Sequence, residues 1–356
     1  MTPNAAFLHL IFAVAITGFS AALAGAILLY IYSRIIGFIG DPNEASSLPI
    51  PSLSGGGFAI VGGFLAGISL IQLVGNFTPI KTNYFWGFSA SLLLIAMASL
   101  YGNFSTRGLP LTAKLGAQVL IVAILMGAGV VIDEVNIPWV GPVRCGWLGY
   151  PLTLLWVLGL TNAYNLMNGQ DGIAASTAVI ASAFFSIIAL QQQSLFIYLS
   201  SLVLCAASLG FLFFNWPPAK IIMDDIGSTF LGFTLAVMAI IAFRYDRSHT
   251  SLLVVPLLLF HFIFDTVFTL VRRLLRGETV TQGRGTHLYQ LLNQLGYSHR
   301  KVIMIYSGIA FIQGLGAVWM VNISGDKRVF IYLPFFLVYV VYGVWLLNCA
   351  RRRGLI

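Results

Sequence analysis

Charge is what this sequence lacks most. Only 8% of its 356 residues are Asp, Glu, Lys or Arg, whereas a soluble domain carries about a quarter. So few charges cannot cover the surface of the two globular domains that the length would otherwise suggest. Because 58% of the residues are hydrophobic and the mean hydropathy is +0.91, we predict an integral membrane protein forming a single domain over residues 1–356.

Cysteine and basic N-terminal residues are also scarce. The three cysteines, Cys145, Cys205 and Cys349, have no metal-ligand spacing and are interpreted as packing residues. The first ten residues contain no Lys or Arg, and the first apolar run extends to Tyr32. Both features argue against a secretory signal peptide and favour a first membrane-spanning helix. We find no linker of low complexity and no repeat of fixed period.

Apolar runs predict an all-α polytopic bundle of about eleven transmembrane helices, because helices satisfy the backbone polar groups within lipid. The predicted spans are 7–32, 56–75, 84–102, 112–132, 148–161, 173–191, 195–214, 228–243, 251–271, 302–321 and 329–349. The net charge of +8 would suggest a nucleic-acid partner for a soluble chain. Here the concentration of Lys and Arg in cytoplasmic loops is the better explanation, so no nucleic acid is expected.

The distribution of basic residues predicts the orientation. If the N-terminus is outside and the C-terminus inside, 13 of the 19 Lys and Arg residues fall on the cytoplasmic side. The polar, glycine-rich stretches follow the first, third, fifth, seventh and ninth spans, at 41–57, 101–110, 162–176, 215–228 and 272–301. All five therefore lie on the cytoplasmic face, where we predict one composite site at the membrane surface.

Two adjacent carboxylates, Asp224 and Asp225, precede the eighth span in the stretch MDDIGS. A helix N-terminus attracts phosphate through its free backbone N–H groups, here near Gly227 and Ser228. A neighbouring aspartate suits Mg²⁺, which is usually held by one or two carboxylates together with substrate phosphates. An ordinary helix cap by Asp or Ser explains the same residues, so both interpretations stay open.

The stretch NAYNLMNGQDGIAAS, residues 162–176, is a polar island in an apolar chain. Asn162 and Asn165 are three residues apart, which places them on one face of a helix. Together with Asp171, such amides can hold a nucleotide or complete a metal shell. A polar loop in which an aspartate caps the sixth span is the alternative.

Asp265 is predicted to lie about two turns inside the ninth span. An ionisable residue within a span is a functional candidate by default, and the structural alternative is an ion pair with Arg272 or Arg273. His261, one turn away, is interpreted as a packed and hydrogen-bonded side chain.

The following loop, 272–301, carries six basic residues. They suit either a substrate diphosphate or anionic lipid headgroups, and His287 is a candidate contact to phosphate or base. Neutralisation of phosphate charge is the main demand in phosphoryl transfer. The alternative of a transporter would place the polar residues near the bilayer midplane on broken helices, whereas nearly all of them lie at one edge here.

The segments NAYNLM, DGIAAS, MDDIGSTFLGF, HLYQLL and GYSHRKV, in this order, resemble the polyprenyl-phosphate N-acetylhexosamine-1-phosphate transferase superfamily. The resemblance covers nearly the whole chain and is nearest to the branch that initiates O-antigen synthesis. It implies a bundle of ten or eleven helices in the bacterial inner membrane. It also implies transfer of HexNAc-1-phosphate from a UDP-HexNAc donor to undecaprenyl phosphate at the cytoplasmic face, with Mg²⁺ or Mn²⁺ and release of UMP. Membrane lipid is an implied partner, and a homodimer is left open.

The resemblance also implies roles for individual residues. Asp225, Asp171, His287 and Asp265 match catalytic positions, and Asp225, Asp171 and Asp224 are the implied metal ligands. Asn162, Asn165, Asn168 and Arg284 correspond to the nucleotide-sugar site. Asp41, Asn43 and Lys114 correspond to the loops near the lipid phosphate.

Several charged positions depart from the family pattern. The expected Asp-Asp pair at the end of the third span is replaced by LYGNFSTRG, which contains no carboxylate. The substituted motif positions are Ala45, Leu48, Ser54, Asn168, Asp224, Arg284 and Gly285. These losses favour a second hypothesis, in which the chain is a catalytically impaired or inactive relative that acts as a binding or assembly partner.

Overall fold

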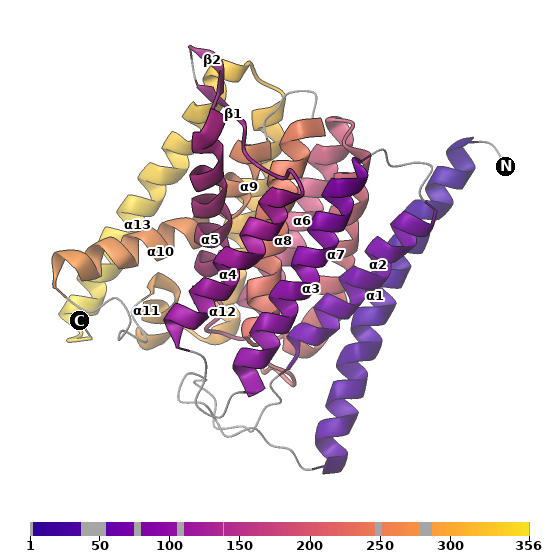
Figure 1. Cartoon of the computed structure of the whole chain (residues 1–356). Helices are drawn as coiled ribbons and strands as arrows, with labels where there is room; N and C mark the ends of the chain where they lie inside the picture. The colour runs from indigo at the N-terminus through magenta and orange to yellow at the C-terminus, as the bar shows by residue number, and fades with distance from the viewer. Residues whose placement is uncertain are drawn as a thin grey trace.

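The computed structural model describes residues 3–36, 55–74, 80–104, 110–137, 139–245, 251–277 and 287–355. Within these ranges the chain forms thirteen α-helices, two short 3₁₀ helices and one two-stranded sheet, which confirms the predicted all-α class (Figure 1). The first eight helices are α1 (Pro3–Ile36), α2 (Gly57–Leu73), α3 (Thr82–Phe104), α4 (Leu111–Gly127), α5 (Gly149–Leu166), α6 (Ile173–Gln191), α7 (Leu195–Asn215) and α8 (Asp225–Tyr245). The others are α9 (Ser251–Leu258), α10 (Phe260–Leu275), α11 (Leu288–Gln294), α12 (His299–Val321) and α13 (Tyr332–Arg352).

Seven segments of the described chain are long and apolar enough to cross a membrane: α1, α3, α6, α7, α8, α12 and the continuous segment Gly325–Arg352 that contains α13. The bent pair α9 and α10 would be an eighth span, and α2 and α4 are shorter apolar helices. A polytopic membrane protein is therefore confirmed, while the total of eleven spans stays a prediction.

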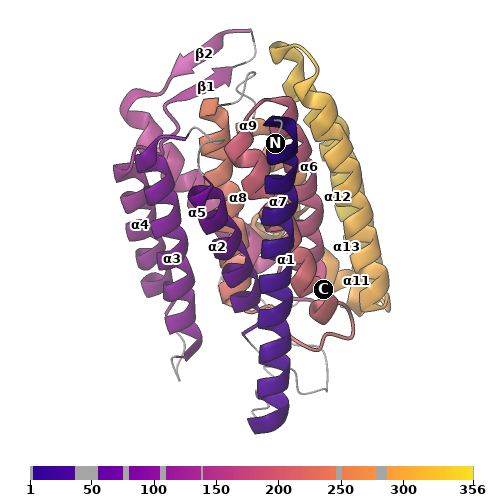
Figure 2. The same cartoon turned by 90° about the vertical axis from the view of Figure 1, so that its right-hand side faces the viewer.

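Helix α8 is the centre of the bundle. Every residue from Ile226 to Phe243 is buried, and the helix packs against α2, α3, α5 and α9. Figure 2 shows α3 and α4 at one side of the bundle and α12 and α13 at the other. A helix that is apolar on all sides is surrounded by other helices. Because its neighbours hold α8 in place, the residues of its first turn have defined positions relative to the residues around them.

The predicted ninth span is not one straight helix. It breaks at Leu259 into α9 and α10, whose axes differ by 75°, and α10 runs across the bundle (Figure 1). Pro256 lies inside α9 just before the break, as expected for a kink. Helix α10 exposes the apolar Val267 and Leu275 and buries Asp265, so its polar side chain faces the protein and its apolar side chains face outward. Asp265 therefore lies on α10, after the break, and not inside one straight ninth span.

A β-hairpin lies at the end of the bundle where α1 begins, and the sequence did not predict it. Strands β1 (Glu134–Ile137) and β2 (Gly141–Arg144) pair antiparallel between α4 and α5. Helix α1 begins toward this end, and α13 ends toward the other (Figures 1 and 2). We call the end where α4 and α8 begin the site end, because the polar stretches gather there.

Candidate functional site

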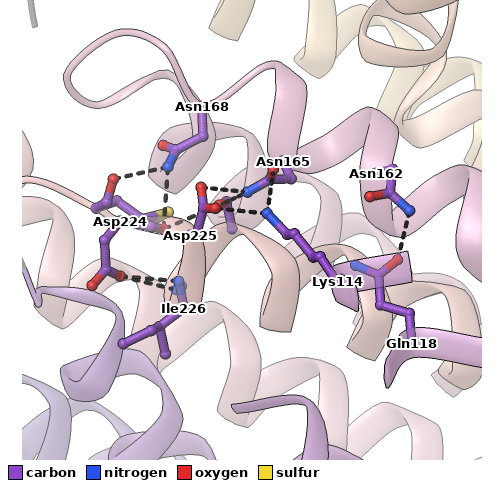
Figure 3. A network of polar contacts seen from close by, with 11 residues as sticks. Lys114, Gln118, Asn162, Asn165, Asn168, Asp224, Asp225 and Ile226 are labelled. Carbon is purple, nitrogen blue, oxygen red and sulfur yellow. Dashed lines mark hydrogen bonds and ion pairs between the residues drawn. The ribbon is translucent and has the colours of Figure 1, made fainter. Parts of the chain in front are cut away.

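The first turn of α8 holds an exposed carboxylate at the site end. Asp225 is the first residue of α8, and its side chain is 51% exposed. Lys114, near the start of α4, places its Nζ 2.6 Å from Asp225 Oδ2 (Figure 3). Asn165, near the end of α5, donates to Asp225 Oδ1 at 3.0 Å and to Ser228 Oγ at 2.8 Å. Three helices far apart in sequence thus converge on one carboxylate.

This triad of Lys114, Asn165 and Asp225 has defined electrostatics. The Lys114 ammonium also donates to Asn165 Oδ1 at 3.4 Å, so the amide contacts both the cation and the anion of the pair. One lysine neutralises one aspartate, and the pair is open enough to water that its own contribution to stability is small. The triad is therefore better suited to binding a charged ligand than to holding the fold together.

Asp224 faces away from the triad (Figure 3). Its Oδ1 accepts from the backbone N–H groups of Ile226 at 3.2 Å and Gly227 at 3.4 Å. Burial raises the pKa of Asp224 to about 6. These contacts favour the helix-cap interpretation for Asp224. Of the two N–H groups that were expected to attract phosphate, Gly227 donates to this carboxylate and Ser228 donates to the backbone oxygen of Asp224 at 3.3 Å.

The other asparagines of the polar island hold the site together. Asn162 donates to Gln118 Oε1 on α4 at 2.8 Å, and Gln118 is a buried amide that the sequence analysis missed. In the sequence, Gln118 stands out only as a single amide within an apolar predicted span. Asn168 donates to the backbone oxygen of Met223 at 2.8 Å and of Asp224 at 3.3 Å. Asn168 therefore fixes the loop that precedes α8.

Asp171 makes a separate contact in the same region. Its Oδ2 accepts from the backbone N–H of Ala219 at 3.2 Å, and burial raises the pKa of its carboxyl above the usual range, partly opposed by that hydrogen bond and by His299. Asp171 thus ties the polar island to the loop that follows α7.

Asp265 and His287 are brought together, as neighbours 3.1 Å apart between Oδ1 and Nδ1. Both are buried, and His287 immediately precedes the short helix α11. His261 is fully buried next to Thr177 and Gln313, as its interpretation as a packed residue expects. Asp41, Asn43 and Arg284 lie outside the described residues.

Helix α11 packs directly on the polar island. Asn293 donates to Gln170 Oε1 at 2.7 Å, and Gln170 donates to the backbone oxygen of His299 at 2.9 Å. Gly169 faces the hydroxyl of Tyr289, which leaves no room for a Cβ atom. The glycine is thus needed for the close approach of the island to α11.

Replacing Gly169 by alanine is therefore expected to destabilise the protein. The new Cβ would overlap the hydroxyl of the fully buried Tyr289, and overpacking of this kind typically costs about 1–3 kcal/mol. Tyr289→Phe should rescue the variant, because the next atoms, Tyr289 Cζ and Gln290 Nε2, are 3.3 and 3.2 Å away. Thermal unfolding in detergent measures both effects. Gly159→Ala, with open space around its Cβ, is the control, and a Gly169→Ala protein as stable as this control would contradict the packing argument.

Comparison with known proteins places these residues in a family. The model of glycosyl transferase family 4 matches residues 85–243. The chain is 30% identical over 317 residues to the decaprenyl-phosphate N-acetylglucosaminephosphotransferase of Mycobacterium leprae, which covers 80% of this chain and 78% of that protein. The chain belongs to glycosyl transferase family 4. The match to the family model includes Lys114, Asn165 and Asp225, whereas Asp265 and His287 lie beyond it.

Two further relatives match over shorter stretches. The probable undecaprenyl-phosphate N-acetylglucosaminyl 1-phosphate transferase of Bacillus subtilis is 32% identical over 244 residues, which are 68% of this chain and 65% of that protein. The phospho-N-acetylmuramoyl-pentapeptide-transferase of Latilactobacillus sakei is 35% identical over 142 residues, 38% and 44% of the two chains. In both cases the chain spans less than two thirds of the relative's length.

The donor set of this family 4 member suits a weakly held Mg²⁺. No group of three or more His, Cys, Asp or Glu side chains gathers around one point in the described part of the chain. Asp225 offers an accessible carboxylate, and Mg²⁺ is commonly held by one or two carboxylates with substrate phosphates completing its shell. Asp225 thus fits a metal that arrives with a phosphorylated substrate, and its partner Lys114 would have to share the carboxylate with it.

Proposed function

We propose that this chain transfers HexNAc-1-phosphate from a UDP-HexNAc donor to undecaprenyl phosphate at the cytoplasmic face of the bacterial inner membrane, with release of UMP. The product would begin an O-antigen or another cell-surface polysaccharide. The observation that carries the proposal is the Lys114–Asn165–Asp225 triad at the site end, in a member of glycosyl transferase family 4. The names of the relatives support the lipid phosphate acceptor and favour N-acetylglucosamine as the first donor to test.

The chemistry asks little covalent work of the protein. A phosphate oxygen of the lipid attacks the sugar-bearing phosphorus of the donor, and the bond from that phosphorus to the oxygen of UMP breaks. Lys114 would neutralise phosphate charge, and Asn165 would orient Asp225 toward the cation. When bound at Asp225, Mg²⁺ would supply further positive charge to the diphosphate.

The missing Asp-Asp pair does not exclude this reaction. The second ionisation of a phosphate monoester has a pKa of about 6, so the attacking oxygen is already ionised near neutral pH. A carboxylate base is therefore not required for the attack, and positioning with charge neutralisation carries the catalysis.

The alternative is an inactive relative that binds nucleotide or lipid without turnover. The specific observation in its favour is that LYGNFSTRG lacks both carboxylates. In addition, the ammonium of Lys114 lies against Asp225, where a metal ion would have to bind. This alternative predicts binding without any metal-dependent exchange.

Exchange of label between UMP and the UDP-sugar separates the two proposals. With undecaprenyl phosphate, unlabelled UDP-HexNAc and Mg²⁺ present, the purified protein is expected to form the lipid diphosphate sugar. In the reverse reaction, labelled UMP should take the sugar-1-phosphate back from that lipid and become labelled UDP-HexNAc. Addition of EDTA should reduce the exchange to background, because Asp225 alone is a weak metal site, and excess Mg²⁺ should restore it. Exchange that is insensitive to EDTA would refute the metal requirement. Lack of exchange with every donor would favour the binding partner.

A further inference from the structure

Asp265 is the most heavily hydrogen-bonded carboxylate in the described part of the chain. Its Oδ1 accepts from Thr269 Oγ1 at 3.2 Å, from His287 Nδ1 at 3.1 Å and from the backbone N–H of Leu288 at 3.0 Å. Its Oδ2 accepts from the backbone N–H of Tyr289 at 3.3 Å and from the hydroxyl of Tyr306 at 3.2 Å. Five donors from two helices, α10 and α12, and the start of α11 therefore surround one side chain.

This environment leaves Asp265 no role in direct contact with substrate. A carboxylate has about four lone-pair sites, and the five donors use its whole capacity. The residue is only 1% exposed, so neither a metal ion nor a phosphate reaches it. Any effect of Asp265 on function must therefore act through one of the groups that donate hydrogen bonds to it.

His287 is the donor with chemistry of its own. Asp265 accepts two backbone N–H groups and so acts as a hydrogen-bond acceptor, and we therefore assign the proton of its contact with His287 to Nδ1. The other ring nitrogen, Nε2, is then the atom left for a ligand. A carboxylate that holds one nitrogen of a histidine fixes both its tautomer and its ring orientation.

The backbone around His287 is fixed as well. Asp265 accepts the first N–H groups of α11, and the His287 backbone N–H donates to Gln290 Oε1 at 3.1 Å. At the other end, Arg353 Nη1 donates to the backbone oxygen of Leu295 at 2.7 Å. Because α11 also packs on the polar island through Asn293 and Gln170, the place of His287 relative to the triad is set by the fold.

We propose that Asp265 is a positioning residue, which holds His287 with a proton on Nδ1 and leaves Nε2 to contact the diphosphate of the nucleotide sugar. The identity of the ligand rests on the proposed function, whereas the arrangement of the two side chains does not. When a diphosphate is bound, the ring would have the Asp265 carboxylate at Nδ1 and the diphosphate at Nε2. It would then donate one hydrogen bond from each nitrogen.

Nitrogen-15 NMR of histidine-labelled protein tests the arrangement without any activity. The chain has five histidines, and a His287→Gln variant identifies the signal of His287 by its loss. At a pH high enough to make the ring neutral, the proton is expected on Nδ1. In Asp265→Asn, whose amide can donate to the ring, the proton is expected to move at least partly to Nε2. A neutral His287 protonated only on Nε2 in the unmodified protein would overturn the proposal.

A double-mutant cycle tests the consequence for transfer. Asp265→Asn is expected to lower kcat about 10- to 100-fold, the usual size when a carboxylate that orients a functional histidine is lost. In the His287→Gln background the same change should cost almost nothing further, because it acts through His287. Thr269→Val, which removes one of the five donors and leaves the His287 contact, is the matched control and should retain kcat within about threefold.

The positioning role would be overturned if the two substitutions lowered kcat independently of each other. Thermal unfolding must show that both variant proteins are folded. Absence of transfer by the unmodified protein would instead refute the proposed function, and the NMR result would then decide the Asp265–His287 arrangement alone.

Discussion

Replacing Asp225 by asparagine is expected to reduce sugar-1-phosphate transfer by at least about 10²- to 10³-fold, the size typical of losing one electrostatic group from a catalytic site. Asp225 is the exposed carboxylate of the triad and the partner of Lys114. Asparagine keeps the shape and the contact to Asn165 but removes the charge that would hold a cation. Initial rates with saturating donor and lipid measure the effect.

Asp326→Asn is the control for the Asp225 variant. It makes the same chemical change in the segment Gly325–Ile331 near the hairpin, where Asp326 Oδ1 accepts from the backbone N–H of Trp139 at 3.2 Å. This variant should retain the activity of the unmodified protein. Because Asp225 is half exposed and contributes little to stability, both proteins should unfold at about the same temperature. An Asp225→Asn protein with near-normal rates would contradict the assignment of the site.

Replacing Gly57 by alanine is expected to destabilise the protein by about 3 kcal/mol, at the upper end of ordinary overpacking. Gly57 begins α2 and lies against Gly227 in the first turn of α8. An added Cβ would overlap the backbone nitrogen of Gly227 and lie 2.7 Å from both its Cα and Asp224 Oδ1. Backbone cannot yield as a flexible side chain does, so α2 and α8 must move apart. The midpoint of thermal unfolding should fall, and transfer should fall with it because the cap of α8 is disturbed.

Gly62 provides the matched test on the same helix. A Cβ at Gly62 meets no atom within 4 Å, and alanine is the better helix former. Gly62→Ala should therefore leave the unfolding midpoint unchanged or slightly higher. Equal destabilisation by Gly57→Ala and Gly62→Ala would contradict the claim that Gly57 is needed for the close contact between α2 and α8.

The sequence predicted best what depends on composition and local pattern. Ten of the eleven apolar runs each contain one helix, because lipid leaves the backbone few alternatives to a helix; the ninth run divides into α9 and α10, and no run predicts α11. The spacing of Asn162 and Asn165 predicted a shared helix face, and both side chains indeed contact α4 or α8. The approach of Lys114 to Asp225 needed the packing of α4 on the bundle, which no local pattern contains.

The largest departures come from long-range contacts. Pro256 was visible in the sequence, but the proline alone predicted neither the 75° break after it nor the burial of Asp265 on α10. Likewise, a pair of Asp265 with Arg272 or Arg273 was the obvious local alternative, whereas the contact of the Asp265 carboxylate at 3.1 Å is with the His287 ring, 22 residues away. A helix cap and a metal ligand also look alike in the letters MDDIGS, and only the direction of each side chain separates Asp224 from Asp225.

The most direct measurement is transfer of sugar-1-phosphate from a panel of UDP-HexNAc donors to undecaprenyl phosphate by the purified protein in detergent. The predicted result is a lipid diphosphate sugar formed with at least one donor, dependent on Mg²⁺ and lost in Asp225→Asn. No product from any donor, with folded protein and an active family member alongside, would contradict the assignment of a transferase and leave binding without turnover as the function of the site.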